Sequence, residues 1–144
     1  MTATPGGVVT PACLEGHTIC WRRADLAVRA TWPPARGTVE VTVEGELDLA
    51  TGELLEQVAA LVAGPGVEVV ADVANLCFCD LAGARSLLRA AELTESAGGV
   101  FSLARARPAL LRVYELAGLP APELAPTPRS HRERGASTPS EGER

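Results

Sequence analysis

Hydrophobic and polar residues alternate in two short segments near the start of the chain. Residues 25–31 place apolar side chains at every second position, and residues 38–43 do the same after a Trp-Pro-Pro break. A period of two is typical of half-buried strands, so the two segments predict a β-hairpin with an open loop over 32–37. The prolines in this loop prevent the strand ladder from continuing through it.

Three later segments place apolar residues at helical spacing. In residues 46–64 they recur until a Gly-Pro-Gly sequence ends the pattern, which predicts an amphipathic helix of about three turns. Residues 81–99 predict a second helix that ends at a Gly-Gly pair. Residues 107–119 predict a third, with Pro108 in its first turn, Gly118 as its stop and apolar positions at Leu110, Leu111, Val113 and Leu116.

Two further segments have the composition of strands. Residues 67–78, VEVVADVANLCF, are apolar with little alternation, which predicts a central strand covered on both faces. Residues 100–104 predict a short strand. The resulting order, β, β, α, β, α, β, α, indicates an α/β fold with parallel pairing after the first hairpin.

The two ends of the chain lack such patterns. Residues 1 to about 24 mix Pro, Gly and Thr with few periodic apolar positions, so we expect a loose leader or a short extra strand. Residues 120–144 are rich in Pro, Ser and Thr and have almost no large apolar residues, which predicts a disordered tail. The expected domain therefore covers residues 25–119.

Composition narrows the class of protein. A chain of 144 residues has room for one ordinary domain, and its formal net charge of −5 argues against a nucleic-acid surface. All 13 basic residues are arginine, which points to a bacterium with a GC-rich genome. The apolar stretches are too short to span a bilayer, and no basic n-region with a long apolar segment marks a secretory signal. We expect a cytoplasmic protein without membrane insertion.

The cysteines, histidines and glycines of the sequence are not arranged as in a catalytic or metal site. The cysteines, Cys13, Cys20, Cys77 and Cys79, have poor spacing for zinc, and Cys77 and Cys79 would face opposite ways on a strand. We interpret them as reduced cysteines. No Gly-rich phosphate loop is present, and both histidines lie in the poorly patterned ends. No enzyme activity, cofactor or metal is expected.

Acidic residues stand where two of the predicted helices begin. Asp80, in the stretch FCDLAGARS, is positioned to cap the second helix, because its carboxylate would accept free N–H groups of the first turn. Asp48 and Thr51 are both plausible caps of the first helix. A helix start of this kind also suits an anion or a phosphoryl group.

Three runs of sequence, VTVEGELDLATGELLEQVAALV, VVADVANLCFCDLAGARSLLRA and LLRVYELAGL, together resemble the STAS domain of bacterial anti-sigma factor antagonists. The resemblance covers about residues 25–119. It implies a small mixed sheet of four to five strands flanked by three to four helices. It also implies a regulatory domain that binds an anti-sigma factor of the serine kinase type and thereby frees a sigma factor.

The family pattern at the second helix is Asp-Ser-Ser/Thr-Gly, in which the kinase phosphorylates the Ser or Thr before Gly. Asp48 matches the family's turn aspartate, Asp80 the aspartate of the pattern and Gly83 its glycine. The acceptor position falls on Ala82, which has no hydroxyl, and Leu81 replaces the other polar residue. The resemblance therefore implies a phosphoswitch loop without its switch, whose binding surface comprises Asp48, Asp80, Leu81, Ala82, Gly83, Arg85 and Ser86.

The sequence leaves other interpretations of the site and of the function open. Ser86 and Thr51 are weak alternative phosphate acceptors, although Ser86 lies about 6 Å further along the helix axis than Ala82. The domain could instead be an accessory subunit of a lipid ABC transporter, or a scaffold that senses a ligand. The pattern does not determine the oligomeric state.

Overall fold

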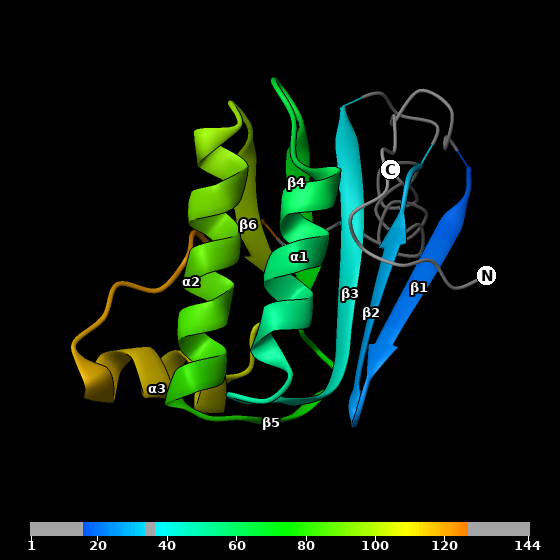
Figure 1. Ribbon diagram of the computed structural model, residues 1–144. Helices are drawn as coiled ribbons and strands as arrows, with labels where there is room; N and C mark the ends of the chain where they lie inside the picture. The colour runs from blue at the N-terminus through cyan, green and yellow to red at the C-terminus, as the bar shows by residue number, and fades with distance from the viewer. Residues whose placement is uncertain (1–15, 34–36, 127–144) are drawn as a thin grey trace, which may run out of the picture.

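The computed structural model describes residues 16–33 and 37–126. Within these ranges the chain forms a mixed sheet with three helices (Figure 1). The elements in chain order are β1 (Thr18–Arg23), β2 (Leu26–Thr31), β3 (Thr38–Leu47), α1 (Gly52–Val62), β4 (Glu68–Asp72), β5 (Leu76–Cys79), α2 (Leu81–Ser96), β6 (Val100–Ala104) and α3 (Pro108–Ala117).

The sheet combines an antiparallel part with a parallel part. Strands β1, β2 and β3 pair antiparallel, with Val28 opposite Val43 and Ala30 opposite Val41, which confirms the predicted hairpin. Strands β4 and β6 extend the sheet in parallel from β3, and β5 pairs with the end of β3. The α/β fold is confirmed, and the described residues form six strands in place of the four to five expected.

The segment 67–78 is two strands, so the prediction of a single central strand is wrong. After β4, the Asp72 carboxylate accepts the Ala74 N–H at 3.0 Å and the Val73 carbonyl accepts the Leu76 N–H, which turns the chain. β4 then pairs with the first half of β3, and β5 pairs with its last residues across a register shift at Gly45. The hydrophobicity pattern of residues 67–78 resembles that of one continuous strand, so it did not reveal the short turn inside the segment.

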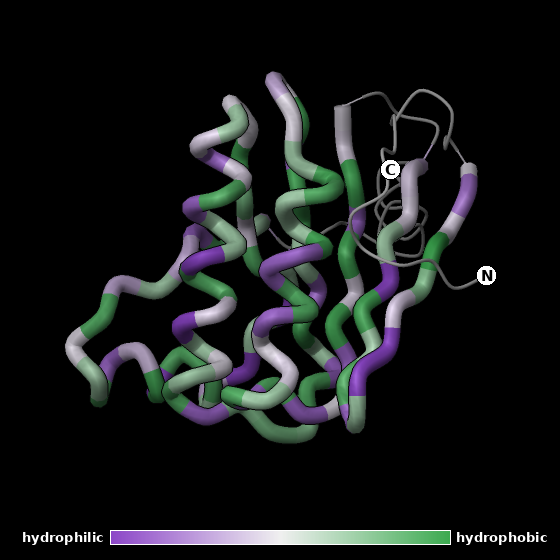
Figure 2. Tube along the Cα trace, viewed as in Figure 1, coloured by the Kyte–Doolittle hydropathy of each residue, from purple (hydrophilic) through white to green (hydrophobic). Residues whose placement is uncertain are grey.

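Helices α1 and α2 lie on one side of the sheet, and α3 packs against the start of α2 (Figure 1). The strand residues that face them form the apolar core, and polar residues alternate with these along β3 and β4 (Figure 2). The expectation that β4 is covered on both faces is therefore wrong. Its residues Glu68, Val70 and Asp72 belong to a face that no helix covers, which we call the open face.

The predicted helices form close to their expected limits. Pro108 occupies the first turn of α3, and Gly118 ends the helix in the left-handed conformation at φ 69°. In α3 only Leu110 and Tyr114 are buried, whereas Leu116 is exposed, contrary to its predicted apolar role. α1 and α2 pack against each other above the sheet.

The sheet extends beyond the predicted domain limits. β1 is the short extra strand that the pattern left open, so residues 18–23 are not a loose leader. At the other end, Leu124 forms a bridge with Leu103, so residues 120–126 are not a free tail. Residues 1–15 and 127–144 lie outside the described residues. None of the helices described has the length and apolar character needed to cross a bilayer.

Candidate functional site

The start of α2 is built around Asp80. Its carboxylate accepts the Gly83 N–H at 2.8 Å, and its carbonyl accepts the Ala84 N–H at 2.9 Å. Asp80 has extended backbone angles, as an N-cap residue requires. The capping role predicted from the sequence is therefore confirmed, and it orients the first turn of α2 at the end of β5.

Gly83 lies where the first turn of α2 meets the end of β3. A Cβ at this position would lie 2.2 Å from the Leu47 carbonyl oxygen and 3.0 Å from the Cys79 sulfur. Only glycine allows this approach, because the nearest atoms belong to backbone that cannot rotate away. The close contact places α2 directly beside the turn that follows β3.

That turn, which carries Asp48, is fixed by its own hydrogen bonds. One carboxylate oxygen of Asp48 accepts the N–H groups of Ala50 and Thr51 at 2.9 and 3.1 Å. The Thr51 hydroxyl donates to the Glu46 carbonyl at 2.9 Å and accepts from the Asp48 N–H at 3.0 Å. Thr51 occupies the N-cap position of α1, but its side chain forms no capping bond to the helix, and Asp48 accepts only N–H groups that precede α1. The prediction that either side chain caps α1 is therefore wrong, because both are used in the turn before the helix.

Exposed apolar side chains lie on the first turn of α2 and on the ends of the two strands that adjoin it. Leu81 is 38% exposed and Ala82 is half-buried, and two residues that the sequence did not single out are also exposed: Leu49 at 84% and Phe78 at 50%. Leu49 follows β3, and Phe78 lies on β5 in register with Glu46. We call Leu49, Phe78, Leu81 and Ala82 the helix-start surface.

Sequence patterns gave little signal for Leu49 and Phe78. Phe78 has the same parity as the buried Leu76, so alternation predicts a buried side chain, and only its place at the end of the sheet exposes it. Leu49 follows the turn aspartate directly, and an apolar residue in such a polar turn was the one available hint.

The remaining predicted site residues fall into two groups. Arg85 is exposed on the outer side of α2. Ser86 and Thr51 are buried, and a Cβ on Gly52 would lie 2.0 Å from the Ser86 hydroxyl oxygen, so Ser86 fills the close contact between α1 and α2. Neither hydroxyl is presented at the surface.

A buried tyrosine of α3 attaches this helix to the first turns of α2. The buried Tyr114 hydroxyl donates to the Ala84 carbonyl at 2.7 Å, and desolvation, with a smaller effect of Cys79, raises the pKa of this phenol.

Burial and the neighbouring Asp80 carboxylate raise the pKa of the Cys79 thiol to about 12. Cys79 is consequently protonated and a poor nucleophile at neutral pH. Within the described residues, no three His, Cys, Asp or Glu side chains group as metal ligands would.

Comparison with known protein families gives a match to most of the described chain. The family model described as MlaB, STAS domain, covers residues 33–125. The chain belongs to this STAS-domain family. The resemblance inferred from the sequence motifs is thereby confirmed.

Solved structures with the same fold include two anti-sigma factor antagonists. An anti-sigma factor antagonist from Mycobacterium paratuberculosis is 24% identical, with a TM-score of 0.54 over 77% of this chain and 92% of that one. The unphosphorylated antagonist SpoIIAA is 21% identical, with a TM-score of 0.50 over 64% of this chain and 81% of that one. SLC26A9 is 16% identical, with a TM-score of 0.52 over 81% of this chain and 24% of that one. A search of curated proteins gave no match.

Proposed function

We propose that this STAS domain is an anti-sigma factor antagonist, which acts by binding an anti-sigma factor of the serine kinase type in the cytoplasm and so frees a sigma factor. The observation that carries the proposal is the helix-start surface. Exposed Leu49, Phe78 and Leu81 lie on or next to an α2 start that is held rigid by Asp80 and Gly83. Exposed apolar groups on a rigid frame are typical of a protein-binding surface.

The charges around this surface indicate the chemistry of the partner. Glu46 and Glu53 are exposed, and Asp48 and Asp80 are half-buried, while Arg85 contributes a positive charge on α2. We therefore expect the partner to present an apolar groove bordered by basic residues, because opposite charges at the rim guide association.

The proposal includes regulation without phosphate at the family position. Ala82 lies in the first turn of α2. It has a methyl group at the position that the resemblance to antagonists assigns to the phosphorylated hydroxyl. A phosphate would bring a charge of about −1.5 to −2 next to Asp80. Without an acceptor there, the kinase cannot release the protein by phosphorylating it. Binding is then constitutive, and the complex persists in the presence of ATP.

The direct experiment mixes the purified protein with the anti-sigma kinases of its own host and ATP, followed by size-exclusion chromatography and intact-mass measurement. The proposal expects a stable complex and an unchanged mass. An added phosphate on the protein would remove the constitutive part of the proposal. Absence of any complex would refute the antagonist role.

A second candidate is an accessory subunit of a lipid ABC transporter. The observation in its favour is that the matching family model is named for MlaB and not for an antagonist. The same helix-start surface would then bind the transporter ATPase. Copurification with an ATPase of the transporter type, and not with a kinase, would favour this role.

A further inference from the structure

The open face of the sheet has a cavity of about 320 Å³ over β3, β4 and β6. Three carboxylates, Glu40, Glu68 and Asp72, and one guanidinium, Arg105, line it together with Pro126. The cavity lies on the opposite side of the sheet from the helices and is separate from the helix-start surface. What binds in this cavity is therefore independent of the proposed function.

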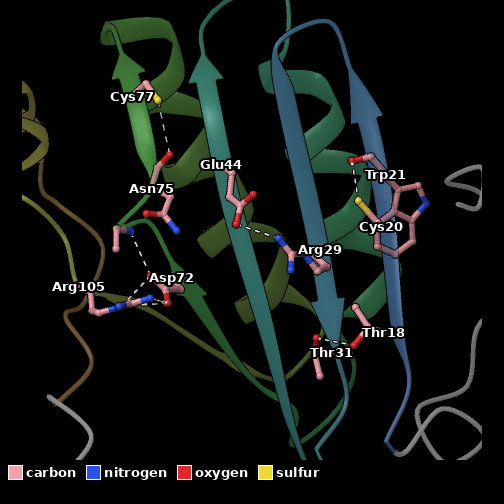
Figure 3. A network of polar contacts seen from close by, with 11 residues as sticks. Thr18, Cys20, Trp21, Arg29, Thr31, Glu44, Asp72, Asn75, Cys77 and Arg105 are labelled. Carbon is pink, nitrogen blue, oxygen red and sulfur yellow. Dashed lines mark hydrogen bonds and ion pairs between the residues drawn. The ribbon is translucent and has the colours of Figure 1, made fainter. Parts of the chain in front are cut away.

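The acidic groups on this face are only partly neutralised by arginine. Arg105 forms a forked contact with Asp72, with its Nε 3.1 Å from one carboxylate oxygen, and Arg29 lies 2.8 Å from Glu44 (Figure 3). Glu40 and Glu68 are exposed and form no ion pair with any residue in the described ranges. The cavity therefore has two carboxylates without a counter-charge.

The chain itself is tethered beside these carboxylates. The Leu103 N–H donates to the Glu123 carbonyl at 2.8 Å, and the Ala125 N–H donates to the Leu103 carbonyl at 2.7 Å. These bonds hold residues 123–125 along the outer edge of β6. They bring Pro126 to the wall of the cavity, where the described part of the chain ends.

The sequence that follows is basic. Residues 127–134 read TPRSHRER, with three arginines, Arg129, Arg132 and Arg134, against one glutamate. Residues 123–125 lie one strand spacing, about 4.8 Å, beyond β6, but Pro126 already lines the same cavity as Glu40 and Glu68. From Pro126, three residues of extended chain span about 10 Å, so Arg129 and the residues that follow can reach carboxylates that line this cavity.

We propose that the basic stretch 129–134 binds to the open face and places its guanidinium groups at Glu40 and Glu68. Arginine suits this site because its planar guanidinium pairs with carboxylates in two-point contacts. The tether at Leu103 raises the local concentration of the stretch, so a weak contact suffices. The open face is then covered by the chain's own C-terminal segment, and partner proteins bind at the helix-start surface.

The test uses the whole chain with its length unchanged. Amide shifts in ¹⁵N-labelled protein are compared between the wild type and the triple variant R129Q, R132Q and R134Q. We expect shift changes at residues 38–42, 68–72 and 104–105, and none at 81–86. Raising the ionic strength from about 0.1 M to about 1 M, which shortens the Debye length from about 10 Å to about 3 Å, should move the same wild-type amides in the same direction.

Matched controls distinguish this contact from a general effect of charge. The variant E141Q and E143Q changes acidic residues further along the same tail and should leave the open-face amides in place. The variant E40Q and E68Q should shift the amides of residues 129–134 as the salt does. Unchanged open-face amides in the arginine variant would overturn the proposal. Shift changes that grow with protein concentration would overturn it too, because they would assign the contact to a second copy.

Discussion

Replacing Gly83 with alanine tests the packing that positions the helix-start surface. A Cβ at this position would lie 2.2 Å from the Leu47 carbonyl oxygen and 2.8 Å from its carbon, so α2 must move away from β3. Overpacking costs about 1–3 kcal/mol, while alanine in place of glycine returns up to about 1 kcal/mol of helix propensity. Since backbone atoms cannot give way, the cost should be at the upper end, with a net loss of about 2 kcal/mol.

Thermal unfolding followed by circular dichroism measures this loss. At about 4–8 °C per kcal/mol for a domain of this size, Gly83→Ala should lower Tm by roughly 8–16 °C. Gly64→Ala is the matched control, because its Cβ would meet only a Val67 methyl group at 3.4 Å, and its Tm should stay close to that of the wild type. A Gly83→Ala protein as stable as the wild type would refute the close contact, since helix propensity alone predicts a gain.

Four further predictions concern the residues around this helix start. Asp80→Ala should cost about 1 kcal/mol in urea unfolding through loss of the cap, whereas Asp80→Asn should be close to neutral; equal losses would contradict the capping role. Tyr114→Phe should cost about 0.5–1.5 kcal/mol by the same assay, because it removes the bond to Ala84, and an unchanged midpoint would argue against that bond. Iodoacetamide at pH 8 should modify exposed Cys77 well before Cys79, as peptide mapping would reveal. Because burial raises the pKa of Cys79 from 9.0 to about 12, the unfolded chain releases this proton first, so stability should fall as pH rises from 9 toward 12; in Cys79→Ala this decrease should be smaller.

Features that depend on neighbouring residues in the sequence were the predictable ones. Alternation in residues 38–43 identified β3, and helical spacing with glycine stops identified α1, α2 and α3. The Asp80 cap followed from local chemistry alone, because the acceptor and its N–H donor are three residues apart. These elements were sufficient to indicate an α/β fold.

Features that depend on long-range packing could not be predicted in the same way. The turn at Asp72 divides an apolar run whose two halves pair with different parts of β3. Phe78 is exposed because the sheet ends beside it, and the Leu124 bridge depends on a free edge of β6. Each of these outcomes is decided by which surfaces remain uncovered once the sheet and helices have assembled.

The affinity of the protein for an anti-sigma factor, measured by titration calorimetry with Ala82→Glu and Ala60→Glu, tests the central claim most directly. Ala82 is in the first turn of α2, and Ala60 is an exposed residue near the far end of α1, so the two variants add the same charge at different places. The account predicts at least tenfold weaker binding for Ala82→Glu, about 1.4 kcal/mol, and unchanged binding for Ala60→Glu. Equal affinities for the two variants, or no binding by the wild type, would contradict it.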